Sequence, residues 1–293
     1  MRALHSRQIT QSQQASSRAK EHLSLLTSPA FVPDADEVRL GLHRHEFRAW
    51  LQPKIDLRTG QVAGAEVLAR WQHPSRGILG PASFIDLMTR KRWLDDLLLE
   101  MLEQSLAFQL KLHQQGRSLD LAFNLSPEQL NGDTLIDRLQ SRLDQQPTVP
   151  ATLTLEITED GAASVSQACI EQLERLSHLG IKLSIDDFGV GHSSLLRLCQ
   201  IPFSEVKLAA AFTALLERPG RHQAVIRHTL ALVDDLGLQL IVEGIETHAQ
   251  HMRLVEMGVR TGQGFLYAKP MPISAFEQWM NTPPMDFQPP STC

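Results

Sequence analysis

Residues 164–187 read SVSQACIEQLERLSHLGIKLSIDD, and this stretch decides the fold. Apolar residues recur at helical spacing as far as Leu179, and Gly180 follows where a helix C-cap is expected. The next residues form a short apolar strand that ends in Asp186 and Asp187. A helix that leads through a glycine into a short buried strand is typical of an α/β fold, in which both elements repeat along the chain.

The same alternation of helix and strand continues on both sides of this stretch. Two further helices are predicted over Trp93–His113 and Arg221–Leu236, and Gly237 ends the second one. Eight candidate strands lie near residues 48–56, 62–71, 119–125, 152–158, 181–187, 204–208, 238–243 and 262–267. Eight strands with intervening helices over about 250 residues predict a TIM-like (β/α)8 barrel. A doubly wound open sheet is the alternative, because periodicity alone does not establish that the sheet closes.

Polar and proline-rich segments flank this pattern. Residues 1–36 are mostly polar and predict an N-terminal tail or linker. Residues 281–293 contain Pro283-Pro284 and Pro289-Pro290, which predict a non-helical C-terminal tail. The barrel is therefore expected over residues 37–280.

Composition excludes several classes of protein. The chain has 293 residues and a net charge of -5, which gives no basis for general binding to a nucleic acid polymer. Its three cysteines, Cys169, Cys199 and Cys293, form no CxxC pair and indicate neither a disulfide framework nor a zinc site. No apolar run reaches the roughly 18 residues of a membrane span, and the N-terminus lacks the apolar core of a signal peptide. A cytoplasmic protein is expected.

Oxygen-bearing side chains interrupt or end several of the short apolar segments. Such side chains are costly to bury unless they are hydrogen-bonded, paired or bound to metal. In a barrel, functional sites form at the C-terminal ends of the strands, where all but one of these residues fall; Glu66 lies slightly further inside its segment. The six residues are Glu66, Asn124, Glu156, Asp186, Asp187 and Glu243.

An all-oxygen ligand set favours Mg²⁺ or Mn²⁺ over zinc, which prefers nitrogen and sulfur. With this many carboxylates, two adjacent ions fit, and one carboxylate of the Asp186-Asp187 pair could bridge them. Two metal ions generate hydroxide from water and stabilise the attacking and leaving oxygens of a displacement at phosphorus.

Each of these residues also has an ordinary structural interpretation. Asn124 precedes Ser126-Pro127 and could cap a helix, and Asp186 to Gly189 could form a turn. A single glutamate at a strand end is more often solvated than catalytic. The occurrence of all six at similar places in successive segments favours one shared site.

Four further residues are candidates for contact with a substrate. Lys207 lies inside a short apolar strand and could activate water or neutralise phosphate, or its ammonium could reach the surface. Gln52 and Arg70 lie in the first two strands and Gln263 lies between two glycines; each could contact substrate or be an ordinary polar side chain. Residues 189–194 predict a mobile loop beside the acidic pair.

Together these motifs resemble the EAL-domain cyclic di-GMP phosphodiesterases of bacteria. The signature tripeptide appears as Glu66-Val67-Leu68, with valine in place of alanine. Further matches, in the family's order over about residues 40–278, are Gln52-Pro53, Asn124-Leu125-Ser126-Pro127, Glu156-Ile157-Thr158-Glu159, Asp186-Asp187-Phe188-Gly189, Lys207, Glu243-Gly244-Ile245-Glu246-Thr247 and Gln263-Gly264.

The resemblance implies a TIM-like barrel, a homodimer, and metal-dependent hydrolysis of cyclic di-GMP to linear pGpG. By this resemblance Lys207 would assist the water nucleophile, Glu243 would also be catalytic, and Glu246 would steady the loop after Asp187. One ion would be held by Glu66, Asn124, Glu156 and Asp186, and a second by Asp187 and Glu243. Gln52, Arg70 and Gln263 would contact or support the substrate.

One departure from the family pattern leaves other functions open. The family usually has aspartate two residues after the lysine, whereas this chain has Ala209. A catalytically impaired receptor, which binds cyclic di-GMP and acts through a partner, is therefore the alternative to an active enzyme. A scaffold that docks a partner through residues 1–36 is a third reading.

Overall fold

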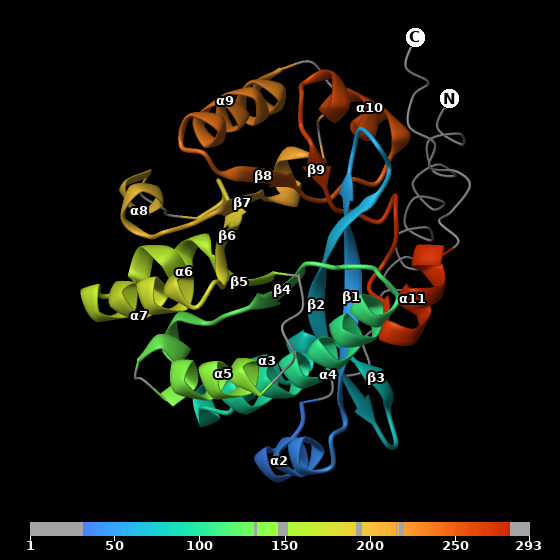
Figure 1. Cartoon of the computed structure of the whole chain (residues 1–293), viewed down its shortest axis with the longest axis vertical. Helices are drawn as coiled ribbons and strands as arrows, with labels where there is room; N and C mark the ends of the chain where they lie inside the picture. Colours follow the sequence, from blue (N-terminus) through green and yellow to red (C-terminus); the bar gives the residue numbers. More distant parts are fainter. Residues whose placement is uncertain are drawn as a thin grey trace, which may run out of the picture.

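The computed structural model describes residues 32–131, 134–145, 152–191, 195–214, 216 and 220–281. Within these residues, eight strands pair side by side into a closed ring (Figure 1). In ring order they are β1 (Phe47–Asp56), β9 (Thr261–Gly262), β8 (Gln239–Val242), β7 (Glu205–Leu208), β6 (Lys182–Phe188), β5 (Leu153–Thr158), β4 (Leu121–Asn124) and β2 (Val62–His73). The pairing of β1 with both β2 and β9 closes the ring. The predicted barrel is confirmed, and the open sheet is excluded.

The first strand runs against the others. β1 pairs antiparallel with β2 and β9, whereas the remaining neighbours in the ring are parallel. No helix separates β1 from β2, because Asp56 starts a tight turn: its Oδ1 accepts hydrogen bonds from the backbone N–H groups of Arg58 and Thr59. A hairpin therefore joins the first two predicted strands.

Two short strands, β3 (Gly77–Leu79) and β10 (Met271–Pro272), pair with β2 and β1 outside the ring. The strand predicted near residues 262–267 is much shorter than expected. It ends early because the chain turns back onto Ile245, whose backbone would clash with a Cβ placed on Gly264. Only glycine permits this close approach.

Helices surround the barrel (Figure 1). The three helices predicted from the sequence appear as α4, α7 and α9. α7 begins three residues later than expected, because Ser166 caps it by accepting a hydrogen bond from the Cys169 N–H. The helices are α2 (Ala35–His43), α3 (Ile85–Lys91), α4 (Leu94–Gln114), α5 (Thr134–Asp144), α6 (Glu159–Ser164), α7 (Gln167–His178), α8 (Leu195–Gln200), α9 (Arg221–Asp235), α10 (His248–Glu256) and α11 (Ile273–Asn281).

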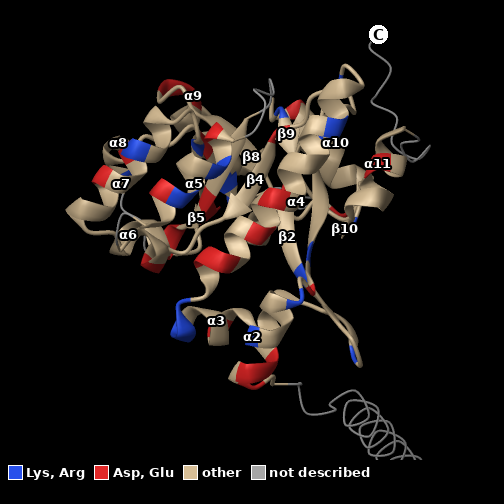
Figure 2. Ribbon diagram, turned by 60° about the horizontal axis from the view of Figure 1, so that its bottom comes forward, with Lys and Arg blue, Asp and Glu red and all other residues tan. Residues whose placement is uncertain are grey.

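The glycines expected to end two helices take the left-handed conformation that this role requires. Gly180 follows α7 with φ 82° and Gly237 follows α9 with φ 69°. Acidic and basic residues are interspersed over outer helices such as α2 and α7 (Figure 2). Among the described residues, no helix has the length and apolar character needed to cross a membrane.

Both predicted tails lie largely outside the described residues. Of the N-terminal segment 1–36, residues 32–36 are described, and Ala35 and Asp36 already belong to α2. Asp34 caps this helix through a hydrogen bond from the Glu37 N–H. Of the C-terminal segment 281–293, only Asn281 is described, as the last residue of α11.

Candidate active site

Lys207 on β7 lies at the centre of a cluster of carboxylates. Its Nζ lies 2.8 Å from Glu243 Oε1, 2.9 Å from Glu156 Oε2, 3.0 Å from Asp186 Oδ1 and 3.4 Å from Glu66 Oε2. The lysine side chain is only 1% exposed, so its ammonium does not reach the surface. The structure thus brings four of the six predicted oxygen donors around one buried cation.

The parallel strands explain this convergence. Glu66, Glu156 and Asp186 lie on β2, β5 and β6, and Glu243 directly follows β8, where its N–H donates to the Leu208 oxygen. Segments far apart in sequence therefore present carboxylates at one end of the barrel, as a (β/α)8 fold arranges its functional side chains.

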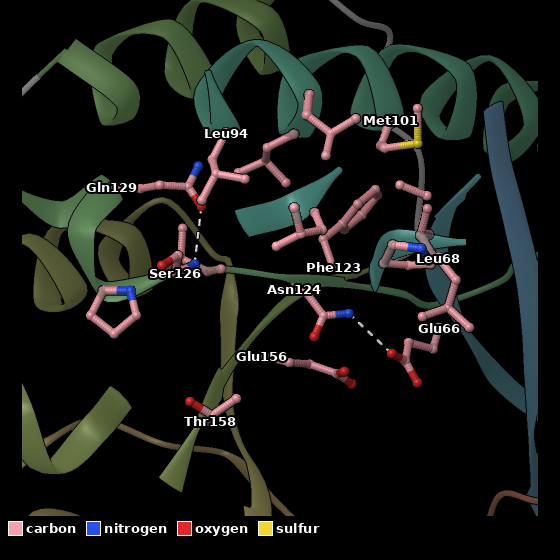
Figure 3. A pocket seen from close by; sticks show the side chains of 18 residues that line it. Glu66, Leu68, Leu94, Met101, Phe123, Asn124, Ser126, Gln129, Glu156 and Thr158 are labelled. Carbon is pink, nitrogen blue, oxygen red and sulfur yellow. Dashed lines mark hydrogen bonds between the residues drawn. The ribbon is translucent and has the colours of Figure 1, made fainter. Parts of the chain in front are cut away.

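Amide side chains hold Glu66 in place. Asn124 Nδ2 donates to Glu66 Oε1 at 3.0 Å (Figure 3), and Gln263 Nε2 donates to Glu66 Oε2 at 2.8 Å. Gln263 also donates to Gln52 Oε1 at 3.2 Å. The helix-cap interpretation of Asn124 is wrong, because Ser126 with Gln129 forms the capping box of the turn that follows.

The remaining predicted residues lie outside this inner network. Asp187 is exposed, has φ 54°, and begins a turn in which its oxygen accepts from the Val190 N–H. Arg70 is half-buried, and its guanidinium carbon lies 5.7 Å from the centre of the Trp50 ring. Glu246 is exposed, and its backbone N–H donates to Gln250 Oε1.

One residue near the site was quoted in the sequence motifs but given no role. Glu159, the buried first residue of α6, accepts hydrogen bonds through Oε2 from the N–H groups of Gly189 at 3.0 Å and Gly191 at 2.5 Å. In the described part of the chain, the loop after Asp187 is thus bonded to Glu159, whereas the resemblance assigned this loop to Glu246. His192 and the rest of the predicted loop to residue 194 lie outside the described residues.

Burial and ion pairing shift the pKa values of the carboxylates in this cluster in different directions. Burial alone would raise the pKa of Glu156, but the charges of Lys207 and Lys54 outweigh it and lower that pKa to about 2. Burial raises the pKa of Glu243 to about 7, with Asp186 adding to the rise and Lys207 opposing it. Burial likewise raises the pKa of Asp186.

Burial would lower the pKa of Lys207, but the surrounding carboxylates raise it well above its usual value, so the ammonium stays charged. Among the described residues, no three His, Cys, Asp or Glu side chains are already spaced as a metal cage, since the carboxylates face Lys207. The donors themselves fit a hard divalent cation: all are oxygens, and Asp186 Oδ1 is buried without a hydrogen bond beside its ion pair.

A cavity of about 420 Å³ opens beside Glu66, Asn124 and Glu156 (Figure 3). Its walls are largely hydrocarbon, with Phe123 from β4 on one side. Five of the other apolar side chains come from α3 and α4: Ile85, Leu94, Leu97, Leu98 and Met101. A concave, mostly apolar space next to a charged cluster is the usual form of a small-molecule site.

Comparisons with known proteins agree with this geometry. The model of the EAL domain matches residues 35–270. The chain is 41% identical over 247 residues to the cyclic di-GMP phosphodiesterase RocR of Pseudomonas aeruginosa, covering 84% of this chain and 63% of RocR. It therefore spans less than two thirds of that relative.

Solved structures give the same result. The PaMucR phosphodiesterase in complex with c-di-GMP is 33% identical, with a TM-score of 0.75 over 82% of this chain and 98% of that one. A manganese and cyclic di-GMP complex of Klebsiella pneumoniae BlrP1 is 26% identical, with a TM-score of 0.67 over 78% of this chain and 56% of that one. By sequence and by fold, the chain belongs to the EAL domain family.

Proposed function

We propose that this chain hydrolyses one phosphodiester of cyclic di-GMP to give linear pGpG, and so lowers the level of a bacterial second messenger. The observation that carries the proposal is the convergence of four carboxylates on the buried ammonium of Lys207, all within 3.4 Å. The names of the relatives support it, since RocR is a cyclic di-GMP phosphodiesterase.

The proposed cofactor is Mg²⁺ or Mn²⁺, with two ions bound. Glu66, Asn124, Glu156 and Asp186 would hold one ion, and Asp187 and Glu243 would help to hold the second. When bound, the ions supply hydroxide from water and a counter-charge for the phosphodiester oxygens. The all-oxygen donor set and the manganese complex of BlrP1 support this assignment.

Lys207 and Glu243 have different roles in the proposed hydrolysis. Lys207 holds the carboxylates together and offers a positive charge beside the attacking water. Glu243, whose Oε1 lies 2.8 Å from Lys207 Nζ, accepts a proton from that water. The water oxygen bonds to phosphorus as the phosphorus–oxygen bond to the 3′ oxygen breaks, and the proton taken up by Glu243 passes to this 3′ oxygen, which leaves as a hydroxyl.

Substrate contacts are assigned to Gln52, Arg70 and Gln263. Gln52 and Gln263 are bonded to each other and through Gln263 to Glu66, so they link the substrate side of the site to a metal ligand. The apolar cavity beside Glu66 suits the flat ring of one guanine base. Glu246 is assigned to the loop after Asp187 by resemblance alone.

The physiological form is proposed to be a cytoplasmic homodimer with a barrel over residues 37–280. The free cysteines Cys169 and Cys199 fit a reducing compartment. Leu195 and Leu196 on α8 are each 59% exposed and offer an apolar face for a second copy.

A receptor without turnover is the second candidate, and Ala209 favours it. This residue is 2% exposed at the end of β7, and its methyl group stands where the family usually has a carboxylate. Substituting Ala209→Asp separates the two readings: a large gain in rate identifies an impaired enzyme, and no gain removes Ala209 as a cause.

The experiment that tests the proposed function is hydrolysis of cyclic di-GMP by the purified protein with Mg²⁺ or Mn²⁺, followed by separation of the nucleotides. A Glu66→Ala variant is the control. Conversion to pGpG by the natural protein alone supports the enzyme. Retained binding of cyclic di-GMP without conversion in either protein supports the receptor.

A further inference from the structure

A second buried lysine lies beneath the carboxylate cluster. Lys54 on β1 is 5% exposed. Its Nζ lies 2.8 Å from Glu156 Oε1 and 3.0 Å from Glu205 Oε1. Lysine is rarely buried without partners, and here two carboxylates supply them.

The position of Lys54 shows that these contacts cross the inside of the barrel. In the ring, β5 lies three strands from β1 in one direction, and β7 lies three strands away in the other. Side chains on strands so far apart meet only through the interior. Lys54 thus ties Glu156 on β5 to Glu205 on β7.

Glu156 is consequently held at both carboxylate oxygens. Lys54 Nζ donates a hydrogen bond to Oε1 at 2.8 Å, and Lys207 Nζ donates one to Oε2 at 2.9 Å. With both oxygens fixed, the carboxylate cannot rotate, and only Oε2 lies on the side of Lys207 and the other carboxylates. Glu156 is 1% exposed, so no water replaces these partners readily.

We propose that Lys54 is a positioning residue, which holds Glu156 in the orientation needed to bind a divalent cation, with Glu205 as its counter-charge. The inference rests on the proposed metal-dependent function. Partners of metal ligands typically contribute about 10–100-fold to metal affinity, because they fix the ligand before the ion arrives.

A purely structural role for Lys54 makes a different prediction. If Lys54 only neutralised buried charge, its removal would harm the site by leaving Glu205 unpaired. Neutralising Glu205 at the same time would then restore the site. If Lys54 acts by holding Glu156, the same second substitution restores nothing, because Glu156 Oε1 still lacks its partner.

The test is calorimetric titration of Mn²⁺ into the metal-free protein of residues 1–293, with thermal unfolding measured on each sample. The variants are Lys54→Met, the double variant Lys54→Met with Glu205→Gln, and Lys182→Met. Lys182 is the matched control, since it lies on a barrel strand but is half-exposed and pairs with Asp120 at 3.7 Å.

We expect Mn²⁺ affinity to fall about 10–100-fold in Lys54→Met and in the double variant, and to stay unchanged in Lys182→Met. The positioning role is overturned if Lys54→Met binds Mn²⁺ as tightly as the natural protein, or if the double variant recovers that Mn²⁺ affinity. Either result leaves the proposed function standing. Absence of Mn²⁺ binding by the natural protein overturns the metal-dependent function itself. If Lys54→Met does not fold, the double variant, which leaves no unpaired buried charge, gives the answer.

Discussion

Glu156 and Lys207 form an ion pair of 2.9 Å in which the glutamate side chain is 0% exposed and the lysine side chain 1% exposed. Such a pair is expensive to remove from water and is not in itself a source of stability. Its presence at the end of a barrel, among further carboxylates, is therefore best explained by the chemistry of the site.

Substituting Lys207→Met should destabilise the metal-free protein. Glu156 keeps its ion pair with Lys54, but Asp186 and Glu243 lose the cation that they face. Removing one partner from a buried ion pair typically costs about 3–5 kcal/mol. Because a divalent cation can replace the lost positive charge, Mn²⁺ should recover part of this stability. Urea unfolding with and without Mn²⁺ measures both effects.

Lys182→Met serves as the control for this variant too, because the Lys182–Asp120 pair at 3.7 Å is half-exposed and should contribute at most about 1 kcal/mol. Equal stability of the two variants would contradict the role assigned to Lys207. Hydrolysis of cyclic di-GMP should be lost in Lys207→Met and retained in Lys182→Met.

Glu243 should make the stability of the metal-free protein depend on pH. Its pKa is raised to about 7 in the folded state, above the usual glutamate value of 4.5, so the folded state binds more protons between these values. Stability is then present at low pH, falls as the pH rises from about 4.5 to 7, and falls no further beyond.

The comparison that isolates this effect is Glu243→Gln, which has no proton to lose. Denaturant unfolding in a chelator, from pH 5 to pH 8, should show the natural protein losing more stability than the variant as the pH rises. Parallel pH profiles would mean that Glu243 does not titrate in this range.

Glu159 should order the loop that follows Asp187. Its carboxylate accepts from the N–H groups of Gly189 and Gly191, and hydrogen bonds to a charged group contribute about 1.5–3 kcal/mol each. Glu159→Gln should therefore speed hydrogen exchange at these two glycines and lower the rate of hydrolysis. Exchange followed by mass spectrometry gives the first readout.

Glu246→Gln is the variant to compare with Glu159→Gln, because the family resemblance assigned the stabilisation of the loop after Asp187 to Glu246. The structure leads us to expect little change in exchange at Gly189 and Gly191 from this variant. If Glu246→Gln loosens the loop and Glu159→Gln does not, the assignment by resemblance is restored.

Much of the fold follows from local sequence. The segment that ends in Asp186 is apolar, is preceded by a helix and Gly180, and appears as β6 within one residue of its predicted bounds. Ring closure does not follow from such patterns, because it depends on the pairing of β1 with β9. These strands are distant in sequence: Gln52 on β1 and Gln263 just after β9 are 211 residues apart.

The inner site likewise has features that the sequence shows and features that it does not. Carboxylates at strand ends are visible in the sequence, since a charged residue interrupts an apolar run. Whether Lys207 reaches the surface or the interior is not visible, because both positions look alike until the partners across the barrel are known. Lys54 was overlooked for this reason: Glu156 and Glu205 lie 102 and 151 residues away.

The cavity beside Glu66 gives a final prediction. Leu98 on α4 lines it and is 6% exposed, so Leu98→Trp should fill space that the substrate needs. KM for cyclic di-GMP should rise about tenfold or more, whereas Mn²⁺ affinity should hardly change, because Lys207 and the metal ligands keep their contacts. Leu98→Met, which nearly conserves volume, is the control and should leave KM as it is. If thermal unfolding shows that Leu98→Trp is folded and its KM equals that of the natural protein, the bound base must lie elsewhere on the barrel.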